Sequence, residues 1–233
     1  MARQPRFDIP GIPFHVVQRG NDRQACFFDD DDRAFHLDTL IDAAAREDVR
    51  VHAWVLMTNH VHLLATPLAS GAVSRMMQSV GRRYVRRINT RWKRTGTLWE
   101  GRFRSSLVDS GEYALACYRY IELNPVRAKM VGAPADCPWS SYRANAFDRD
   151  DGLTRPHPAF VALGEHPDER RLRYREWVAA GTHPDELDGI RTHTEQGKAW
   201  GGEAFRCRVE ATSGRCARLR PPGRPRKMVS DPV

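Results

Sequence analysis

The sequence predicts an α+β fold in which helices cover one face of an antiparallel sheet, followed by a C-terminal helical extension and a basic tail. Its strand-like and helix-like segments follow one another as strand–helix–strand–strand–helix–strand–helix. That order is typical of this class and differs from the alternation of a doubly wound parallel sheet. Two of the strand-like runs, 49–57 and 60–66, are separated only by Thr58-Asn59, which is a signal of an antiparallel hairpin.

The first elements are expected before that hairpin. Residues 13–19 alternate as a strand does, and the strand is expected to end at Gly20-Asn21-Asp22. Residues 31–47 carry apolar side chains at helical spacing, and the leading aspartates favour a helix N-terminus because carboxylates interact well with the helix dipole.

Three further elements follow the hairpin. A helix is expected over 72–92, a strand over 102–108 after a glycine-bracketed loop, and a second long helix over 112–123, which meets Pro125. The first of these helices has an apolar stripe that favours core packing, formed by Val73, Met77, Val80, Tyr84, Ile88 and Trp92.

Composition divides the chain into three expected parts. Residues 1–150 hold the sheet and its helices, and residues 151–205 are short helical pieces punctuated by His and Pro. Residues 206–233 form a basic tail that is expected to be flexible and to bind DNA, because its end has too few apolar residues to fold alone.

Length and composition also exclude several classes of protein. The 233 residues can bury a sizeable core, and no stretch approaches the roughly 20 apolar residues of a membrane helix. The N-terminus lacks the apolar region of a signal peptide. The five cysteines are odd in number and have no Cys-x-x-Cys spacing, so they indicate reduced thiols rather than a disulfide framework or a zinc ribbon. A soluble, cytoplasmic protein is expected.

The charge distribution indicates a polyanionic partner. The net charge is +8 and the isoelectric point is about 9.6. Between residues 75 and 104 there are ten Lys or Arg against one acid, interleaved with Tyr84, Trp92 and Trp99. A solvated face is the alternative, but this pattern favours a nucleic-acid surface. The side chains expected to contact DNA there are Arg82, Arg83, Arg86, Arg87, Arg102 and Arg104, with Trp99 available for base stacking.

His60 and His62 are the first candidates for chemistry. They stand at positions i and i+2 of a predicted strand, so their side chains point to the same face while Val61 points the other way. Two imidazoles on one rigid face can provide two ligands of a divalent metal ion. Alone the pattern is weak, since most such pairs are structural.

The helix over 112–123 offers a nucleophile and a further ligand. Asn124 lies four residues after Tyr120, so in a continuing helix the phenol and the amide share one face. Two alternatives stay open at this point. Asn124 before Pro125 is also a good N-cap for a new helix, and Tyr118 with Glu122 has the same spacing and offers a carboxylate.

Several long motifs, in this order, resemble the single-tyrosine HUH transposases, specifically the branch associated with repetitive extragenic palindromes (REP) in bacteria. The resemblance is strongest over residues 7–145, and a further short match lies at the C-terminus. The matching stretches are 15–21 (His-Val-Val-Gln-Arg-Gly-Asn), 56–64 (Leu-Met-Thr-Asn-His-Val-His-Leu-Leu), 95–103 (Thr-Gly-Thr-Leu-Trp-Glu-Gly-Arg-Phe), 120–128 (Tyr-Ile-Glu-Leu-Asn-Pro-Val-Arg-Ala), 139–142 (Trp-Ser-Ser-Tyr) and 223–227 (Gly-Arg-Pro-Arg-Lys).

The resemblance implies a ferredoxin-like (RRM-like) sheet and assigns a role to each candidate. His60 and His62 correspond to the HUH histidines, Tyr120 to the nucleophile and Asn124 to the third metal ligand. The implied enzyme cleaves single-stranded hairpin (REP-like) DNA and transfers the strand through a covalent 5′-phosphotyrosine, with Mg²⁺ or Mn²⁺ as cofactor. Tyr113 and Tyr118 are then packing residues, and the protein is expected in the cytoplasm, associated with the nucleoid, as a monomer or homodimer.

The tail and the rival functions complete the expectations. Gly223-Arg224-Pro225-Arg226 resembles an AT-hook core, so Arg224 and Arg226 are expected to contact DNA, although a merely electrostatic tail fits nearly as well. The rivals are a replication initiator or relaxase of the wider HUH group, a noncatalytic DNA- or RNA-binding protein on the same scaffold, and a structural zinc protein that uses His52, His60 and His62.

Overall fold

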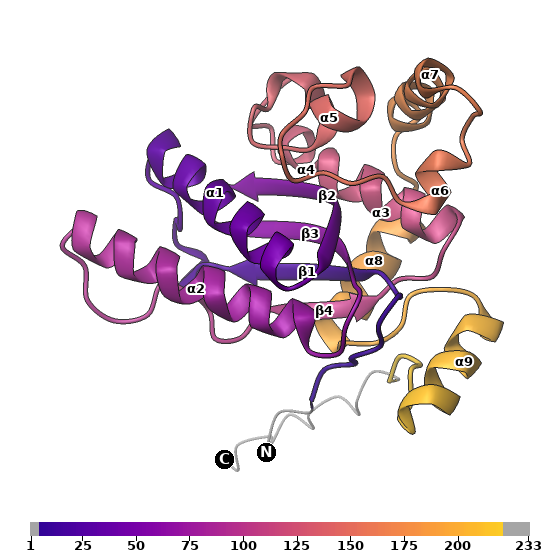
Figure 1. Ribbon diagram of the computed structural model, residues 1–233, viewed down its shortest axis with the longest axis horizontal. Coiled ribbons are helices and arrows are strands. Elements are labelled where there is room, and N and C mark those ends of the chain that lie inside the picture. Colours follow the sequence, from indigo (N-terminus) through magenta and orange to yellow (C-terminus); the bar gives the residue numbers. More distant parts are fainter. Residues whose placement is uncertain (1–4, 221–233) are drawn as a thin grey trace, which may run out of the picture.

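A four-stranded antiparallel sheet, in the order β2-β3-β1-β4, lies at the centre of the computed structural model, which describes residues 5–220 (Figure 1). The first strand pairs with both β3 and β4 and therefore lies inside the sheet. This order, with a helix after β1 and another after β3, is ferredoxin-like and confirms the predicted fold class. The strands are β1 (Phe14–Arg19), β2 (Val49–Met57), β3 (His60–Pro67) and β4 (Arg104–Leu107).

Helices α1 (Asp30–Arg46) and α2 (Ala72–Arg91) cover one face of this sheet, as expected (Figure 1). The predicted stripe of α2 is buried up to Ile88, where it packs on apolar side chains of the sheet. Trp92 was expected in the same stripe, but it follows the last helical residue, is 40% exposed, and donates its indole N–H to Asp32 at 2.9 Å. The stripe prediction is therefore wrong at its last member.

A second core lies on the opposite face of the sheet, so helices cover both faces rather than the one face expected from the sequence. It is built on Ala53, Val55 and Leu64 of the sheet, and α3 covers it together with helices from the C-terminal part. The elements that follow β4 are α3 (Glu112–Glu122), α4 (Asn124–Arg127), α5 (Tyr142–Phe147), α6 (Pro158–Val161), α7 (Pro167–Ala179), α8 (Pro184–Gln196) and α9 (Glu203–Ser213), with short 3₁₀ turns at Asn21–Arg23 and Pro134–Asp136.

The part of the chain after residue 150 packs closely on the sheet domain. Phe160 stacks on Tyr118 of α3, with ring centroids 6.0 Å apart, and Arg119 of α3 binds Glu186 of α8 at 2.6 Å. Helix α9 crosses the expected boundary at residue 205, so residues 206–213 are helical where composition predicts a flexible tail. Arg224 and Arg226 lie outside the described residues.

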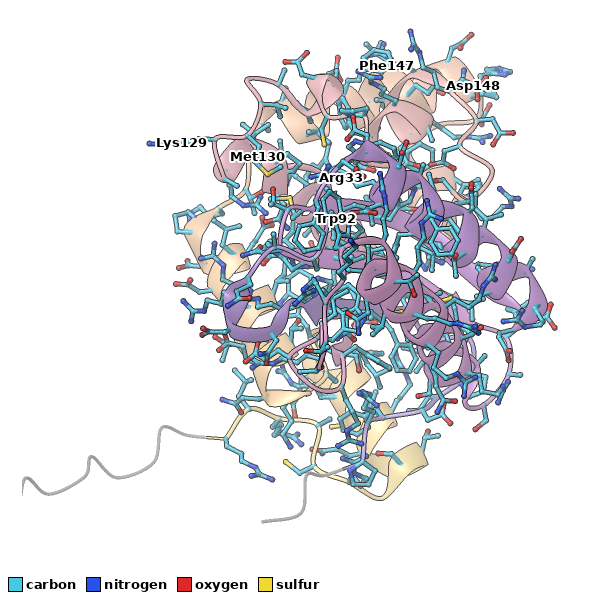
Figure 2. The ribbon with its side chains drawn as sticks, turned by 90° about the vertical axis from the view of Figure 1, so that its left-hand side faces the viewer. Arg33, Trp92, Lys129, Met130, Phe147 and Asp148 are labelled. Atoms are coloured by element: carbon cyan, nitrogen blue, oxygen red, sulfur yellow. The ribbon has the colours of Figure 1, made fainter. Side chains whose placement is uncertain are left out.

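The five cysteines all lie within residues 5–220, and three of them are buried. No helix among residues 5–220 is long and apolar enough to cross a membrane. All five cysteines are free thiols, as predicted. Several large apolar side chains are exposed on one side of the molecule, among them Trp92, Met130 and Phe147 (Figure 2).

Candidate active site

The candidate histidines lie on the face of the sheet that carries the second core. In the sheet, His60 pairs with Arg19 of β1 and Met57 of β2, and His62 pairs with Val17 and Val55. The alternation of β3 therefore places His60 and His62 on one face, as the spacing predicted, with ring centroids 4.9 Å apart.

The two-residue turn before β3 is held firmly in place. The carbonyl of Thr58 accepts the backbone N–H groups of Cys26 and Phe27 at 3.0 and 3.2 Å, and the carbonyl of Asn59 accepts that of Gly20 at 2.8 Å. Gly20 is required there, because a Cβ atom at this position would lie only 2.2 Å from a backbone oxygen. His60 thus starts its strand from a fixed point.

Hydrogen bonds also fix the tautomer of His60. The Asn59 amide donates from Nδ2 to the carbonyl of Arg23 at 2.8 Å, which leaves its Oδ1 as an acceptor 2.6 Å from His60 Nδ1. His60 therefore carries its proton on Nδ1 and keeps a lone pair on Nε2. This is the arrangement found in metal-binding histidines, which donate their other ring N–H to a fixed acceptor.

His62 is held by a histidine that the sequence analysis did not single out. His15 of β1 lies on the same face, its Nε2 is 2.9 Å from His62 Nδ1, and the two rings stack with centroids 5.1 Å apart. Among residues 5–220, no hydrogen bond engages Nε2 of His60 or of His62.

All three imidazoles are kept neutral near pH 7. Burial lowers the pKa of His60 to about 4 and that of His15 to about 3. Burial also holds the pKa of His62 well below its usual value, and the neighbouring charges of Arg127 and Arg19 act in the same direction. A neutral imidazole keeps the lone pair that a metal ligand needs.

Tyr120 of α3 packs directly against this histidine pair. Its ring centroid lies 5.6 Å from that of His62 and 5.5 Å from that of His15, edge to face in both cases. Tyr120 is 6% exposed and lines a cavity of about 70 Å³.

Arg127 adds a positive charge beside the tyrosine. Its guanidinium lies 4.6 Å from the centre of the Tyr120 ring and donates through Nη2 to the Tyr120 carbonyl. Its Nε and Nη1 atoms are buried and have no hydrogen-bond partner among the described residues. Burial lowers its pKa to about 10, so the side chain remains charged at neutral pH.

Asn124 follows Tyr120 at the junction of two helices. Helix α3 ends at Glu122 and α4 begins at Asn124, with Leu123 between them still in helical conformation. Leu123, rather than Asn124, is therefore the N-cap of α4, and Pro125 occupies its first turn. The Asn124 Nδ2 atom is buried without a hydrogen-bond partner among residues 5–220.

Two alternatives from the sequence do not fit this arrangement. The Glu122 carboxylate is fully buried away from the histidines, where it accepts hydrogen bonds from Ser141, Asn145 and Tyr174. His52, the third ligand of the zinc hypothesis, uses both ring nitrogens elsewhere: Nδ1 lies 2.7 Å from the Arg155 carbonyl and Nε2 lies 2.8 Å from the Thr66 hydroxyl. Among the described residues, no group of three or more His, Cys, Asp or Glu is arranged to hold a metal ion.

Tyr113 and Tyr118 are packing residues, as the resemblance implied. Tyr118 is fully buried in the second core, where its hydroxyl accepts the His157 backbone N–H at 3.0 Å. Tyr113 packs edge to face on Trp200, with centroids 5.2 Å apart.

The cavity beside Tyr120 has a strongly basic rim. Arg102 and Arg104, two of the predicted DNA contacts, lie there, and Arg104 is on β4 directly opposite Val17. Two carboxylates, Glu100 and Glu195, also line it. The basic residues of the rim are Arg19, Arg102, Arg104 and Arg191.

A second, larger groove of about 730 Å³ opens between α2 and the segment before β4. Arg82, Arg86 and Arg102 line it, so Arg102 borders both cavities. Arg83 and Arg87, also predicted to bind DNA, lie further along α2: Arg83 binds Asp42 at 3.2 Å, and Arg87 stacks over Phe35 at 4.4 Å.

The aromatic residues of the basic stretch are mostly buried. Tyr84 is fully buried and donates its hydroxyl to the Cys26 carbonyl at 2.6 Å. Trp99 is 8% exposed and stacks on Tyr84 with centroids 5.8 Å apart, so one ring face is taken by the core and little of the ring is left for a base in this conformation.

Comparisons with known proteins give a family match and similar solved structures. Residues 9–124 match the family model described as "Transposase IS200 like". The structure of a REP-associated tyrosine transposase bound to a REP hairpin superposes with a TM-score of 0.54 at 18% identity, covering 67% of this chain and 93% of that one. A candidate transposase from Deinococcus radiodurans R1 is 20% identical over 56% of this chain and 91% of that one, with a TM-score of 0.35. The comparison with curated proteins gives no match.

The matched region begins before β1 and ends at Asn124, so it contains the paired histidines, the tyrosine and the asparagine. The overall fold is similar to that of the REP-associated tyrosine transposase. This chain belongs to the IS200-like family of single-tyrosine transposases, with the fold of the REP-associated branch.

Proposed function

We propose that this protein is a metal-dependent single-stranded DNA endonuclease and strand transferase that acts on hairpin DNA through a covalent 5′-phosphotyrosine. The observation that carries the proposal is the contact of Tyr120 with His62 beside His60, in a cavity rimmed by arginines. Family membership supports transposase chemistry in general. The similar structure was determined with a REP hairpin, which supports the same class of substrate here.

The residues present suit a hydrated divalent cation. His60 and His62 are neutral and each keeps an unengaged Nε2, while Asn124 would contribute its amide oxygen as the third ligand. Imidazole and amide oxygen, completed by phosphate oxygens, suit Mg²⁺ or Mn²⁺. Such an ion would supply charge neutralisation at a nonbridging phosphate oxygen and hold the phosphate in line.

Tyr120 is the nucleophile in this proposal. Its Oη forms a bond to phosphorus as the bond from phosphorus to the 3′ oxygen breaks, so the 5′ phosphate stays on the protein. The phenol loses its proton and the departing 3′ oxygen gains one, so no net proton is consumed. Because the phosphodiester energy is kept in the tyrosyl bond, another 3′ hydroxyl can reverse the step without ATP.

Arg127 and the rim arginines act on the charge of the phosphate. Arg127 holds the backbone of Tyr120 and places two unpartnered nitrogens, Nε and Nη1, next to its ring, where their N–H groups can bind phosphate oxygens. Arg102 and Arg104 lie on the same rim and can guide the single strand toward the tyrosine.

The hairpin stem is proposed to follow the basic surface of α2. Arg82, Arg86 and Arg102 line the larger groove, and Arg83 and Arg87 extend the surface along the helix. Since Arg102 borders both cavities, a strand leaving the groove can pass directly to the site of cleavage. Phosphate contacts of this kind give affinity without sequence information.

The test is adduct formation on denaturing gels with hairpin-bearing single-stranded DNA, with and without Mg²⁺ or Mn²⁺. Wild type should form a metal-dependent protein–DNA adduct, and Tyr120→Phe should form none while still binding the hairpin. Tyr118→Phe is the matched control, since that buried hydroxyl on the same helix only accepts a backbone N–H. Hairpin binding by wild type without any adduct would favour a noncatalytic DNA-binding protein on this scaffold.

A further inference from the structure

Helix α8 supplies the site with a continuous chain of buried polar side chains. Thr194 of α8 has its Oγ1 2.8 Å from His15 Nδ1 and 3.0 Å from Ser106 Oγ. His15 Nε2 lies 2.9 Å from His62 Nδ1. All four side chains are buried, and they connect α8 and β4 through β1 to β3.

The direction in which these hydrogen bonds donate decides which ring nitrogen of His62 keeps a free lone pair. If His62 donates its Nδ1–H to His15 Nε2, His15 must donate its Nδ1–H to Thr194, and Thr194 can donate to Ser106. His62 then keeps the lone pair on Nε2, as His60 does. A threonine hydroxyl can serve as the acceptor for His15 because it both donates and accepts.

Packing alone does not explain this choice of side chains. These hydrogen-bonded side chains lie beside apolar residues of the second core such as Leu64 and Ala53, where an apolar side chain would fill the same space. Buried polar groups contribute little net stability even when they are fully hydrogen bonded, whereas they hold one another in defined orientations. A role in orienting His62 accounts for the polar side chains.

Helix α8 is also fixed relative to the helix that carries the nucleophile. Glu186 of α8 binds Arg119, the neighbour of Tyr120, at 2.6 Å, and the Arg119 side chain is only 5% exposed. Arg191 of α8 lies on the rim of the catalytic cavity. Helix α8 therefore contacts both the strand side of the site, through His15, and the helix that carries Tyr120, through Arg119. It does so although it lies well beyond the residues matched by the family model.

We propose that Thr194 and His15 are positioning residues for His62, and that α8 is in this way an integral part of the catalytic centre. The inference rests on the proposed function, because positioning His62 matters for a bound ion. The expected effect of losing such an outer-shell contact is about tenfold in metal affinity.

The test measures Mn²⁺ binding to the full-length protein without DNA, by isothermal titration calorimetry. Thr194→Val, which keeps shape but removes the acceptor for His15, should weaken Mn²⁺ binding about tenfold. Thr194→Ser should stay within about twofold of wild type, because it keeps the hydroxyl. Thr39→Val is the matched control, since Thr39 is fully buried in α1 with no hydrogen-bond partner among the described residues for its hydroxyl.

Adduct formation provides a second readout. For Thr194→Val the Mn²⁺ concentration at half-maximal rate should rise about tenfold, while the rate at saturating Mn²⁺ and the hairpin affinity change by less than about threefold. His15→Gln should behave in the same way, and it replaces Thr194→Val if that variant has a lowered melting temperature.

The failure of this inference can be told from the failure of the proposed function. If His62→Ala abolishes Mn²⁺ binding while Thr194→Val and His15→Gln bind as tightly as wild type, the positioning role is overturned and the metal site stands. If wild type shows no Mn²⁺ binding that depends on His62, the metal site itself is wrong, and the positioning role falls with it.

Discussion

Glu122 gives the protein a stability that should depend on pH in a way one substitution can isolate. The residue lies two positions after Tyr120, is fully buried, and accepts hydrogen bonds from Ser141, Asn145 (2.7 Å) and Tyr174. Burial raises its pKa from 4.5 to about 7, and the three hydrogen bonds only partly oppose that rise. These partners come from outside α3, so Glu122 anchors α3 to α5 and α7.

The sign of the pH dependence follows from the raised pKa. Between pH 4.5 and 7 the native carboxyl holds its proton while the unfolded chain has lost it, so the native state binds more protons and stability falls as pH rises. The stability contributed by the protonated Glu122 carboxyl is complete below pH 4.5. It decreases as the pH rises from 4.5 to 7 and is lost above pH 7. For these two pKa values the free energy of unfolding of wild type should decrease by about 2.5 kcal/mol between pH 5 and pH 8.

Glu122→Gln removes this titration and keeps the size and most of the hydrogen bonds. The difference in unfolding free energy, variant minus wild type, should therefore become more positive by about 2.5 kcal/mol from pH 5 to pH 8. Urea unfolding in metal-free buffer at several pH values measures this free-energy difference. The contributions of all other titratable groups are common to both proteins and cancel in the difference. A difference that stays constant with pH would refute the reasoning, because it would mean that Glu122 is ionised in the native protein throughout.

Two other substitutions test the charges around the site. Arg127→Met should lower the rate of adduct formation by about 100-fold with little change in hairpin affinity, because it removes the donors proposed to bind the reacting phosphate; an unchanged rate would exclude that role. Arg82→Gln should reduce the slope of log affinity against log salt concentration by about 0.7 to 0.9, as expected for one lost phosphate contact. Arg171→Gln serves as its control, since Arg171 of α7 pairs with Asp148 and Asp168, and an equal slope change there would point to a general charge effect.

The sequence predicted the features that depend on local pattern. The alternation around His60 and His62, the two-residue turn before them and the helix that carries Tyr120 all appear where spacing placed them. Such features need only the side-chain period of a strand or helix, which short segments carry by themselves. The fold class also followed, because the order of elements restricts how a sheet can be covered.

Features that depend on long-range pairing could not be predicted. His15 became part of the site because β1 pairs with β3, and a strand's neighbours cannot be read from its own alternation. Thr194 lies in a helix of low apolar content, where the sequence offered no chemical pattern. The burial of Trp99 and Tyr84 could not be predicted either. A basic stretch with aromatic residues has the same sequence pattern whether its rings face the core or the solvent.

The firmly held turn before β3 has a consequence for kinetics. Because backbone hydrogen bonds from Gly20, Cys26 and Phe27 lock the residues that lead into His60, the backbone of the paired histidines would need no rearrangement to receive the proposed ion. Their ordering entropy is lost during folding rather than at binding. Ion exchange at such a site should follow the rate at which the hydrated cation sheds water, and selectivity should rest on donor chemistry instead of on closure of the protein around the ion.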